Sequence, residues 1–332
     1  MKQLRIVTIG GGTGTHMLLS GLKKYVPEVE LSAVVTVADT GGSTGRLRDA
    51  FGFLPVGDSR MALTALSADN DSESLLRDLF QYRFEKGDGL AGHNFGNLFL
   101  TALTDLLGSE EQALLAAGKL LHVCGNVIPV AGEKLNLLAR YEGGVIAEGE
   151  SIIDMNGLHL PPTTRIERIW IEPEVPASRF AREAIHEATH IILGPGDLYT
   201  STIANLVVPG IREALELSDA SIVVIPSLMT KAAQTSKMTL SAQLKELERY
   251  SGRSADLILL NSTAFPKELL EHYAGEHEFP FFDDLPKASH IIRADLLRSE
   301  PVIEEKGDVS RRSLLRHDPH KVAATIMSAI RK

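Results

Sequence analysis

A glycine-rich turn near the start of the chain constrains the fold more than any other stretch. An apolar run over residues 4–9 leads into Gly10-Gly11-Gly12-Thr13-Gly14-Thr15, and an amphipathic segment follows over 16–25. Strand, glycine turn and helix in this order are typical of a nucleotide-binding βα unit. Glycines let the backbone approach a phosphate closely, and the first helical turn directs N–H groups at the anion. We therefore expect an anion site at Gly11, Gly12, Thr13 and Gly14.

The same turn leaves three interpretations open. A dinucleotide fingerprint has glycine where this chain has Thr15, although Asp39 lies near the place of the expected acid. The turn is thus compatible with NAD, with another nucleotide, or with a plain glycine turn that only packs a helix on a strand.

Two further loops rich in small polar residues follow predicted strands. The strand over 30–38 runs into a loop over 39–49, and the strand over 190–193 runs into a loop over 194–201. The carboxyl ends of parallel strands meet at one edge of a sheet, where open α/β sheets bind their ligands. A ligand that reaches all three loops is a nucleotide diphosphate or a similar anion. Candidate contacts in these two loops are Asp39, Gly42, Ser43, Thr44, Arg46, Gly196, Asp197, Tyr199 and Thr200.

The order of the remaining segments predicts the architecture. Residues 57–123 show helical spacing, and 127–172 contain a glycine hairpin and an alternating strand. After Pro173, strands and helices alternate to the end of the chain. We therefore expect a single domain over 1–332: an α/β, Rossmann-like, doubly wound and mostly parallel sheet with a helical insertion and a small antiparallel excursion.

Charge and cysteine content exclude some partners. The formal net charge of the 332 residues is −9, which argues against nucleic acid or an anionic membrane as the main partner. The single cysteine, Cys124, excludes an intramolecular disulfide and favours a reducing, cytoplasmic location. No apolar stretch approaches the length of a membrane span.

Six motifs in order along the chain resemble the gluconeogenesis-factor (YvcK) family, which is related to the 2-phospho-L-lactate transferases (CofD) of deazaflavin coenzyme synthesis. The matching stretches are Gly10–Gly14, Val37–Asp49, Gly57–Arg60, Gly92–Thr104, Gly194–Ile211 and Arg316–Pro319.

The resemblance implies a cytoplasmic protein that binds UDP-sugars such as UDP-N-acetylglucosamine. It also implies a role in cell shape and wall synthesis on gluconeogenic carbon sources, with no established catalytic reaction. By the family pattern, Thr13, Asn205 and Arg316 are ligand contacts, and Asn97 in the GHNFGN stretch is a further candidate.

One departure from the family pattern bears on the ligand. Asp197 stands where the family usually has serine, and an acid there would repel a bare diphosphate. Either a cation such as Mg²⁺ accompanies the ligand, or the ligand differs. We predict no dedicated metal site from the residues themselves. A homo-oligomer is an open alternative to a monomer.

Two enzymatic functions remain as alternatives to a binding protein. The first is a Mg²⁺-dependent transferase acting on a nucleotide diphosphate-linked substrate, with Asp39 helping to hold the ion. The second is an NAD-dependent oxidoreductase. Against the second, no acid–base pair for hydride transfer stands out in the sequence.

Overall fold

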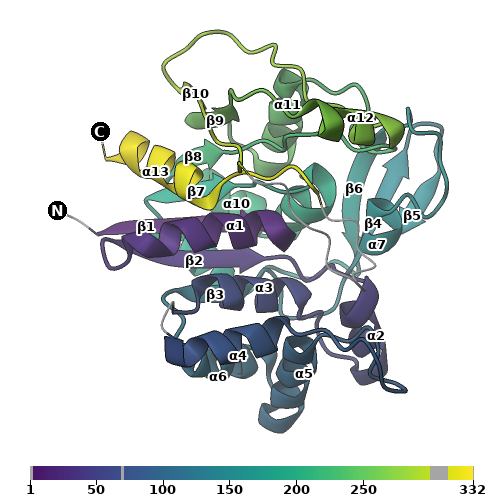
Figure 1. The fold of residues 1–332 in the computed structure, drawn as a ribbon, viewed down its shortest axis with the longest axis vertical. Coiled ribbons are helices and arrows are strands. Elements are labelled where there is room, and N and C mark those ends of the chain that lie inside the picture. The colour runs from purple at the N-terminus through teal and green to yellow at the C-terminus, as the bar shows by residue number, and fades with distance from the viewer. Residues whose placement is uncertain (1–2, 69–70, 300–312, 332) are drawn as a thin grey trace.

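A seven-stranded, all-parallel sheet forms the centre of the computed structural model, which describes residues 3–68, 71–299 and 313–331 (Figure 1). The strand order is β10-β9-β8-β7-β1-β2-β3. The strands of this sheet are β1 (Leu4–Gly10), β2 (Val29–Val35), β3 (Asn126–Pro129), β7 (His190–Leu193), β8 (Ser221–Val224), β9 (Leu257–Asn261) and β10 (Ile291–Ala294).

Strand alternation assigns the apolar side chains to two layers of helices. Ile6, Ile192 and Val223 face α1 (Gly12–Leu22), α3 (Gly57–Leu66) and α13 (Pro319–Ile330) in one core cluster. Val7 and Ile191 belong to the opposite cluster, with α8 (Arg179–Glu187), α10 (Ile211–Leu217) and α11 (Leu240–Ser251). A sheet buried on both faces explains why its strands are nearly continuous apolar runs. The expected doubly wound α/β fold is confirmed.

The helical segment between β2 and β3 has a core of its own. It comprises α3, α4 (Asp71–Gln81), α5 (Phe95–Leu107) and α6 (Glu110–Leu120). Leu63, Phe80, Leu100 and Leu114 are buried together between these helices. The expected helical insertion is therefore present, packed beside the β2 and β3 side of the sheet (Figure 1).

The antiparallel excursion forms a separate sheet with strand order β5-β4-β6. Its strands are β4 (Asn136–Tyr141), β5 (Ile146–Glu148) and β6 (Ile166–Glu172), and α7 (Glu150–Asp154) follows β5. Our prediction placed residues 127–129 in this excursion, but β3 pairs in parallel with β2 as the outer strand of the main sheet. Four residues were too few for periodicity to separate the two assignments.

The strand order reverses between β1 and β7. The chain runs from β1 outward to β2 and β3, and β7 then returns to the other side of β1 and continues to β10. At such a reversal the connections leave the two central strands in opposite directions and open a crevice at their carboxyl ends. The fold therefore places its ligand-binding edge at the ends of β1 and β7. The remaining helices are α2 (Gly42–Phe51), α9 (Ala204–Leu206) and α12 (Lys267–Gly275).

Candidate functional site

The segments that follow β1 and β7 are in direct contact at the reversal of strand order. A Cβ atom built on Gly14 would lie 2.0 Å from the carbonyl oxygen of Pro195, so only glycine fits there. Gly12 has a φ of +62°, in the left-handed region that favours glycine. Helix α1 already begins at Gly12, earlier than the expected start at His16. The glycines therefore form the first turn of α1, with Thr13 half-buried among them.

The second polar segment is also a helix, which corrects the expected long loop over 39–49. Helix α2 begins at Gly42, whose φ is +47°. The carboxylate of Asp39 accepts the Gly41 N–H at 2.8 Å and holds the turn before the helix. The glycine and serine content looked like a loop, but it serves the tight turn and close packing of a helix start. Helices α1 and α2 thus both point their N-termini toward this edge, where anions are stabilised.

Asp58 connects the helical insertion to the turn after β1. Helix α3 begins at Gly57, and the Asp58 carboxylate in its first turn accepts the Gly12 N–H at 2.8 Å. A carboxylate of the protein thus occupies one of the N–H groups at the start of α1. Any ligand phosphate must share this helix terminus with Asp58.

A buried polar network fixes α2 against the insertion. Asn97 accepts a hydrogen bond from the Arg60 Nε at 2.8 Å and donates one to the Thr44 hydroxyl at 3.2 Å. The hydroxyl oxygen of Ser43 and the Nδ1 atom of His93 lie within hydrogen-bond distance, 3.1 Å apart. All five side chains are buried. Of the expected contacts, Ser43, Thr44 and Asn97 therefore lie behind the N-terminus of α2 and position it, while Gly42 is exposed at its tip.

The acids at this edge influence one another. Burial, followed by the charge of Asp39, raises the pKa of Asp58 to about 7. Burial also raises the pKa of Asp39, against the lowering effects of the Gly41 N–H and the Thr44 hydroxyl. A cation placed between these two carboxyl groups would relieve their repulsion.

Lys231 supplies a positive charge beside Asp197. Its ammonium group lies 2.9 Å from the Asp197 carboxylate and also pairs with Asp154 of α7. Burial raises the pKa of Asp197, but the Lys231 charge outweighs this effect and lowers it below its usual value. The acid that we expected to repel a diphosphate is therefore paired with a cation of the chain itself, which it shares with Asp154.

Sequence analysis missed three charged residues of this cluster: Glu150, Asp154 and Lys231. Burial raises the pKa of Glu150 well above its usual value, and the charges of Asp39 and Asp154 add to the effect. Glu150 and Asp154 follow a hairpin that the sequence assigned only to an excursion. An acid directly after Gly149 was the available signal, and it is too weak to identify a site.

The structure separates several expected contacts from the exposed edge. Tyr199 is buried in the core, where its hydroxyl donates to the Ile166 carbonyl at 3.4 Å and to Glu246 at 3.3 Å. Thr200 is buried and donates to Asp154 at 3.3 Å. Asn205 is fully buried and donates to the Gly10 carbonyl at 3.1 Å. These residues support the segments after β1 and β7 from below, whereas Gly196 and Asp197 are partly exposed.

Two arginines belong to this edge, one exposed and one half-buried. Arg46 is an exposed residue of α2 and donates to the Ala91 carbonyl at 3.2 Å. Arg316 donates to the Ser313 carbonyl at 3.0 Å, and its neighbour His317 pairs with Leu297, three residues beyond the end of β10. The distant segment around Arg316 thus returns to the carboxyl edge of the sheet, on the β9 and β10 side.

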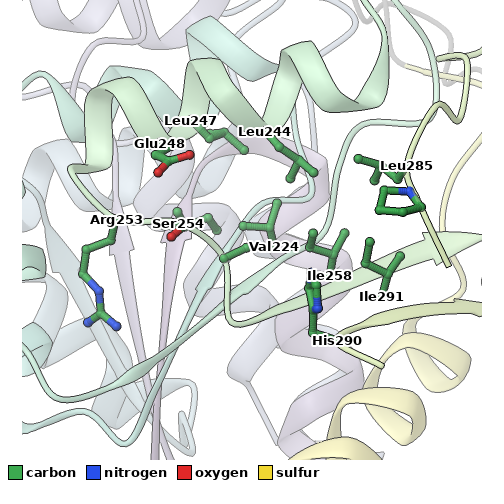
Figure 2. A pocket seen from close by; sticks show the side chains of 13 residues that line it. Val224, Leu244, Leu247, Glu248, Arg253, Ser254, Ile258, Leu285, His290 and Ile291 are labelled. Carbon is green, nitrogen blue, oxygen red and sulfur yellow. The ribbon is translucent and has the colours of Figure 1, made fainter. Parts of the chain in front are cut away.

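An apolar pocket of about 230 Å³ lies elsewhere, beneath α11 (Figure 2). Leu244 and Leu247 point down from the helix, and Ile258 and Ile291 line the opposite wall at the amino-terminal halves of β9 and β10. Its volume is below the roughly 300–1,000 Å³ of ordinary ligand sites. The glycine turns at the opposite ends of the strands remain the better candidate.

The candidate site can bind an anion and, with it, a divalent cation. Two helix N-termini and two arginines suit phosphate oxygens. Among the described residues, no group of three or more His, Cys, Asp or Glu side chains is placed to hold a metal ion. Mg²⁺ often binds through one or two carboxylates and completes its shell with substrate phosphates. Asp39 and Asp58 fit that use.

Comparisons with known proteins agree with this fold. The family model for the 2-phospho-L-lactate transferase CofD matches residues 6–297. The chain is 38% identical to the gluconeogenesis factor of Bacillus subtilis, over 99% of this chain and 98% of that protein. It is 37% identical to the gluconeogenesis factor of Listeria monocytogenes, over 98% and 95% of the two chains.

A crystal structure of a Bacillus halodurans protein of the UPF0052 family superimposes with a TM-score of 0.85. The two chains are 35% identical, with 98% of this chain and 100% of that chain covered. The protein therefore belongs to the CofD family, and within it to the gluconeogenesis factors. In the described parts of the chain, no helix is both long and apolar enough to cross a membrane.

Proposed function

We propose that this protein binds a UDP-sugar, such as UDP-N-acetylglucosamine, at the carboxyl edge of the sheet. Its role is that of a cytoplasmic regulator of cell shape and wall synthesis during growth on gluconeogenic carbon sources. The observation that carries the proposal is the close packing of the α1 N-terminus on the segment after β7, at the reversal of strand order, with the α2 N-terminus at the carboxyl end of the neighbouring strand β2. Helix N-termini at this edge suit the phosphate groups of a nucleotide.

The charges at the edge support a diphosphate rather than an uncharged ligand. Lys231 pairs with Asp197 and so reduces the repulsion between this acid and an incoming phosphate. Arg46, on α2, and Arg316, on the β9 and β10 side of the edge, would then supply guanidinium groups to the phosphate or sugar oxygens of the ligand. The Asp39 carboxylate is then left to bind a ribose or sugar hydroxyl, or a cation that accompanies the phosphates.

Thermal unfolding tests the ligand class. UDP-N-acetylglucosamine at about 100 times its dissociation constant should stabilise the fold by roughly 2.7 kcal/mol, and NAD should not. Arg316→Ala should weaken binding by about 1.5–3 kcal/mol, the range for a hydrogen bond to a charged group. Its stability without ligand should change by less than about 0.5 kcal/mol. Arg179→Ala, on the exposed surface of α8, is the matched control.

Two results would contradict the proposal. A rise in the melting temperature with NAD, but with no UDP-sugar, would favour a dinucleotide-binding protein. Unchanged affinity in Arg316→Ala would remove that arginine from the site.

A Mg²⁺-dependent transferase is a second candidate, favoured by the mutual influence of Asp39 and Asp58. Under this reading, chelation of Mg²⁺ should weaken UDP-sugar binding to the unaltered protein, and Asp39→Asn should remove that dependence. Incubation of the UDP-sugar with candidate acceptors should then release UDP. Binding that is unaffected by chelator, with no UDP released, would leave the binding protein as the better description.

A further inference from the structure

A large groove lies along the outer strand β3, away from the glycine turns. Its volume is about 1370 Å³, and β3 lies between walls formed by α6 and α8. The segment directly after α2, with Phe53 and Leu54, closes one end. This volume exceeds the roughly 300–1,000 Å³ of a small-molecule site, so the groove is suited to a segment of polypeptide.

The lining of this acidic groove carries more negative than positive charge. Its basic residues are Lys119, Lys134 and the titratable His122. Its acids are Glu30, Asp105, Glu110, Glu111, Glu133, Glu183 and Glu187.

Three of the seven acids already pair with arginines. Glu30 and Glu187 both bind Arg5, at 3.3 and 3.2 Å, and Glu183 binds Arg179 at 2.6 Å. The other four acids make no ion pair with any residue that the structure describes.

Glu110 stands apart from the other acids because it is buried. The residue is 9% exposed, and within the described parts of the chain neither carboxylate oxygen has a hydrogen-bond partner. Burial raises its pKa to about 8. The dipole of α6 favours an acid in the first turn, but it would favour a solvated side chain equally. A buried carboxyl group without a hydrogen-bond partner destabilises the free protein, and a donor that arrives from outside would remove that cost and stabilise its charged form.

Large apolar side chains are exposed on both walls of the groove. Leu115 of α6 is 58% exposed and Phe180 of α8 is 46% exposed, and both line the groove. Large exposed apolar side chains around a desolvated polar group resemble the energetic centre of protein interfaces.

We propose that the acidic groove binds a basic segment of another protein, with a lysine or arginine of that segment paired to Glu110. Apolar residues next to the basic one pack against Leu115 and Phe180. Charge complementarity selects a basic partner and excludes nucleic acid.

Side chains rather than an added β-strand carry the recognition. Pro129 of β3 has no N–H to donate to a neighbouring strand, and its carbonyl already accepts the Ser178 hydroxyl at 2.9 Å.

Selection from a phage-displayed library of random dodecapeptides tests this inference. The unaltered protein is the bait, and the selected peptides are synthesised and titrated by fluorescence anisotropy. They should carry a lysine or arginine next to apolar residues. Glu110→Gln should weaken their binding at least tenfold, while Glu268→Gln, an exposed acid in the first turn of α12, should not change it. Leu115→Ser and Phe180→Ser should each weaken binding without altering thermal unfolding.

Several outcomes would overturn the inference. One is a set of selected peptides that lack basic residues, and another is a selection that enriches no peptide. The third is Glu110→Gln binding the peptides as tightly as the unaltered protein does. Sedimentation that shows a dimer dissociated by Glu110→Gln would assign the groove to a second copy of the chain. UDP-sugar binding by the groove variants is measured in parallel, so that failure here is distinguished from failure at the carboxyl edge.

Discussion

The carboxyl edge and the acidic groove both contain carboxyl groups withdrawn from solvent, partly at the edge and almost fully in the groove, and these groups differ in their partners. At the edge, Asp58 accepts the Gly12 N–H, and Asp154 and Asp197 share the Lys231 ammonium group. In the groove, Glu110 has no hydrogen-bond partner among the described residues. Under the two proposals, the edge, whose acids have partners within the chain, receives an anion, and the groove, whose buried acid has none among the described residues, receives a cation.

Substitution of a tightly packed glycine at the edge should give the largest difference between the two regions in the free energy of unfolding. Gly14→Ala places a Cβ 2.0 Å from the Pro195 carbonyl oxygen, where only backbone movement can relieve the overlap. We expect a loss of more than about 3 kcal/mol in the free energy of unfolding, together with loss of nucleotide binding. Gly132→Ala in the groove meets no atom within 4 Å and should change stability by less than about 1 kcal/mol. Denaturant unfolding of both variants measures these free energies. A loss for Gly14→Ala as small as that for Gly132→Ala would show that the edge is not tightly packed.

Removal of the compensating cation should give the next largest effect. Lys231→Met leaves the carboxylates of Asp154 and Asp197 facing each other, and we expect a loss of about 2–4 kcal/mol at pH 7. The loss should shrink toward pH 4, because protonation removes the repulsion. Asp197→Ser in the same chain should restore part of the stability. Lys245→Met, at an exposed position of α11, is the control. A loss that does not vary with pH would mean that packing, not charge, explains the role of Lys231.

Substitution of Glu110, the acid of the groove without a partner among the described residues, should have a smaller effect and should raise the free energy of unfolding rather than lower it. The unfolded chain loses the Glu110 proton near pH 4.5, whereas the folded protein keeps it until about pH 8. Stability therefore falls as the pH rises through this window. Glu110→Gln should raise the free energy of unfolding by about 1–3 kcal/mol at pH 8 and leave it unchanged at pH 4. Its exposed neighbour Glu111→Gln should show no such slope. A variant less stable at both pH values would point to a donor for Glu110 within the protein.

Much of the architecture followed from local patterns. The apolar runs of β1, β2 and β7 and the glycines after them predicted parallel strands whose ends share one edge, and the fold confirms it. The segment at Gly42 was assigned wrongly because glycine, serine and threonine are as frequent in loops as in a tightly packed helix start. Residue type alone does not separate these two uses of glycine.

The surroundings of the predicted contact residues were harder to foresee than the strands. Tyr199 and Asn205 belong to motifs of the family, but the structure buries them as supports of the turns above. Lys231 lies far along the chain from Asp154 and reaches it only because α7 and the segment after β8 meet in space. Such pairs have no spacing rule, since no regular element joins their positions.

The sequence by itself determined the order of strands and helices, the glycine turns and the acidic balance of the chain. Each of these depends on neighbouring residues and on the steric limits of the backbone. The tertiary structure alone decided which carboxyl groups are compensated: Asp58 by the start of α1, Asp197 by Lys231, and Glu110 by no described residue. Burial and charge pairing depend on distances between segments far apart in the chain, and only folding sets those distances.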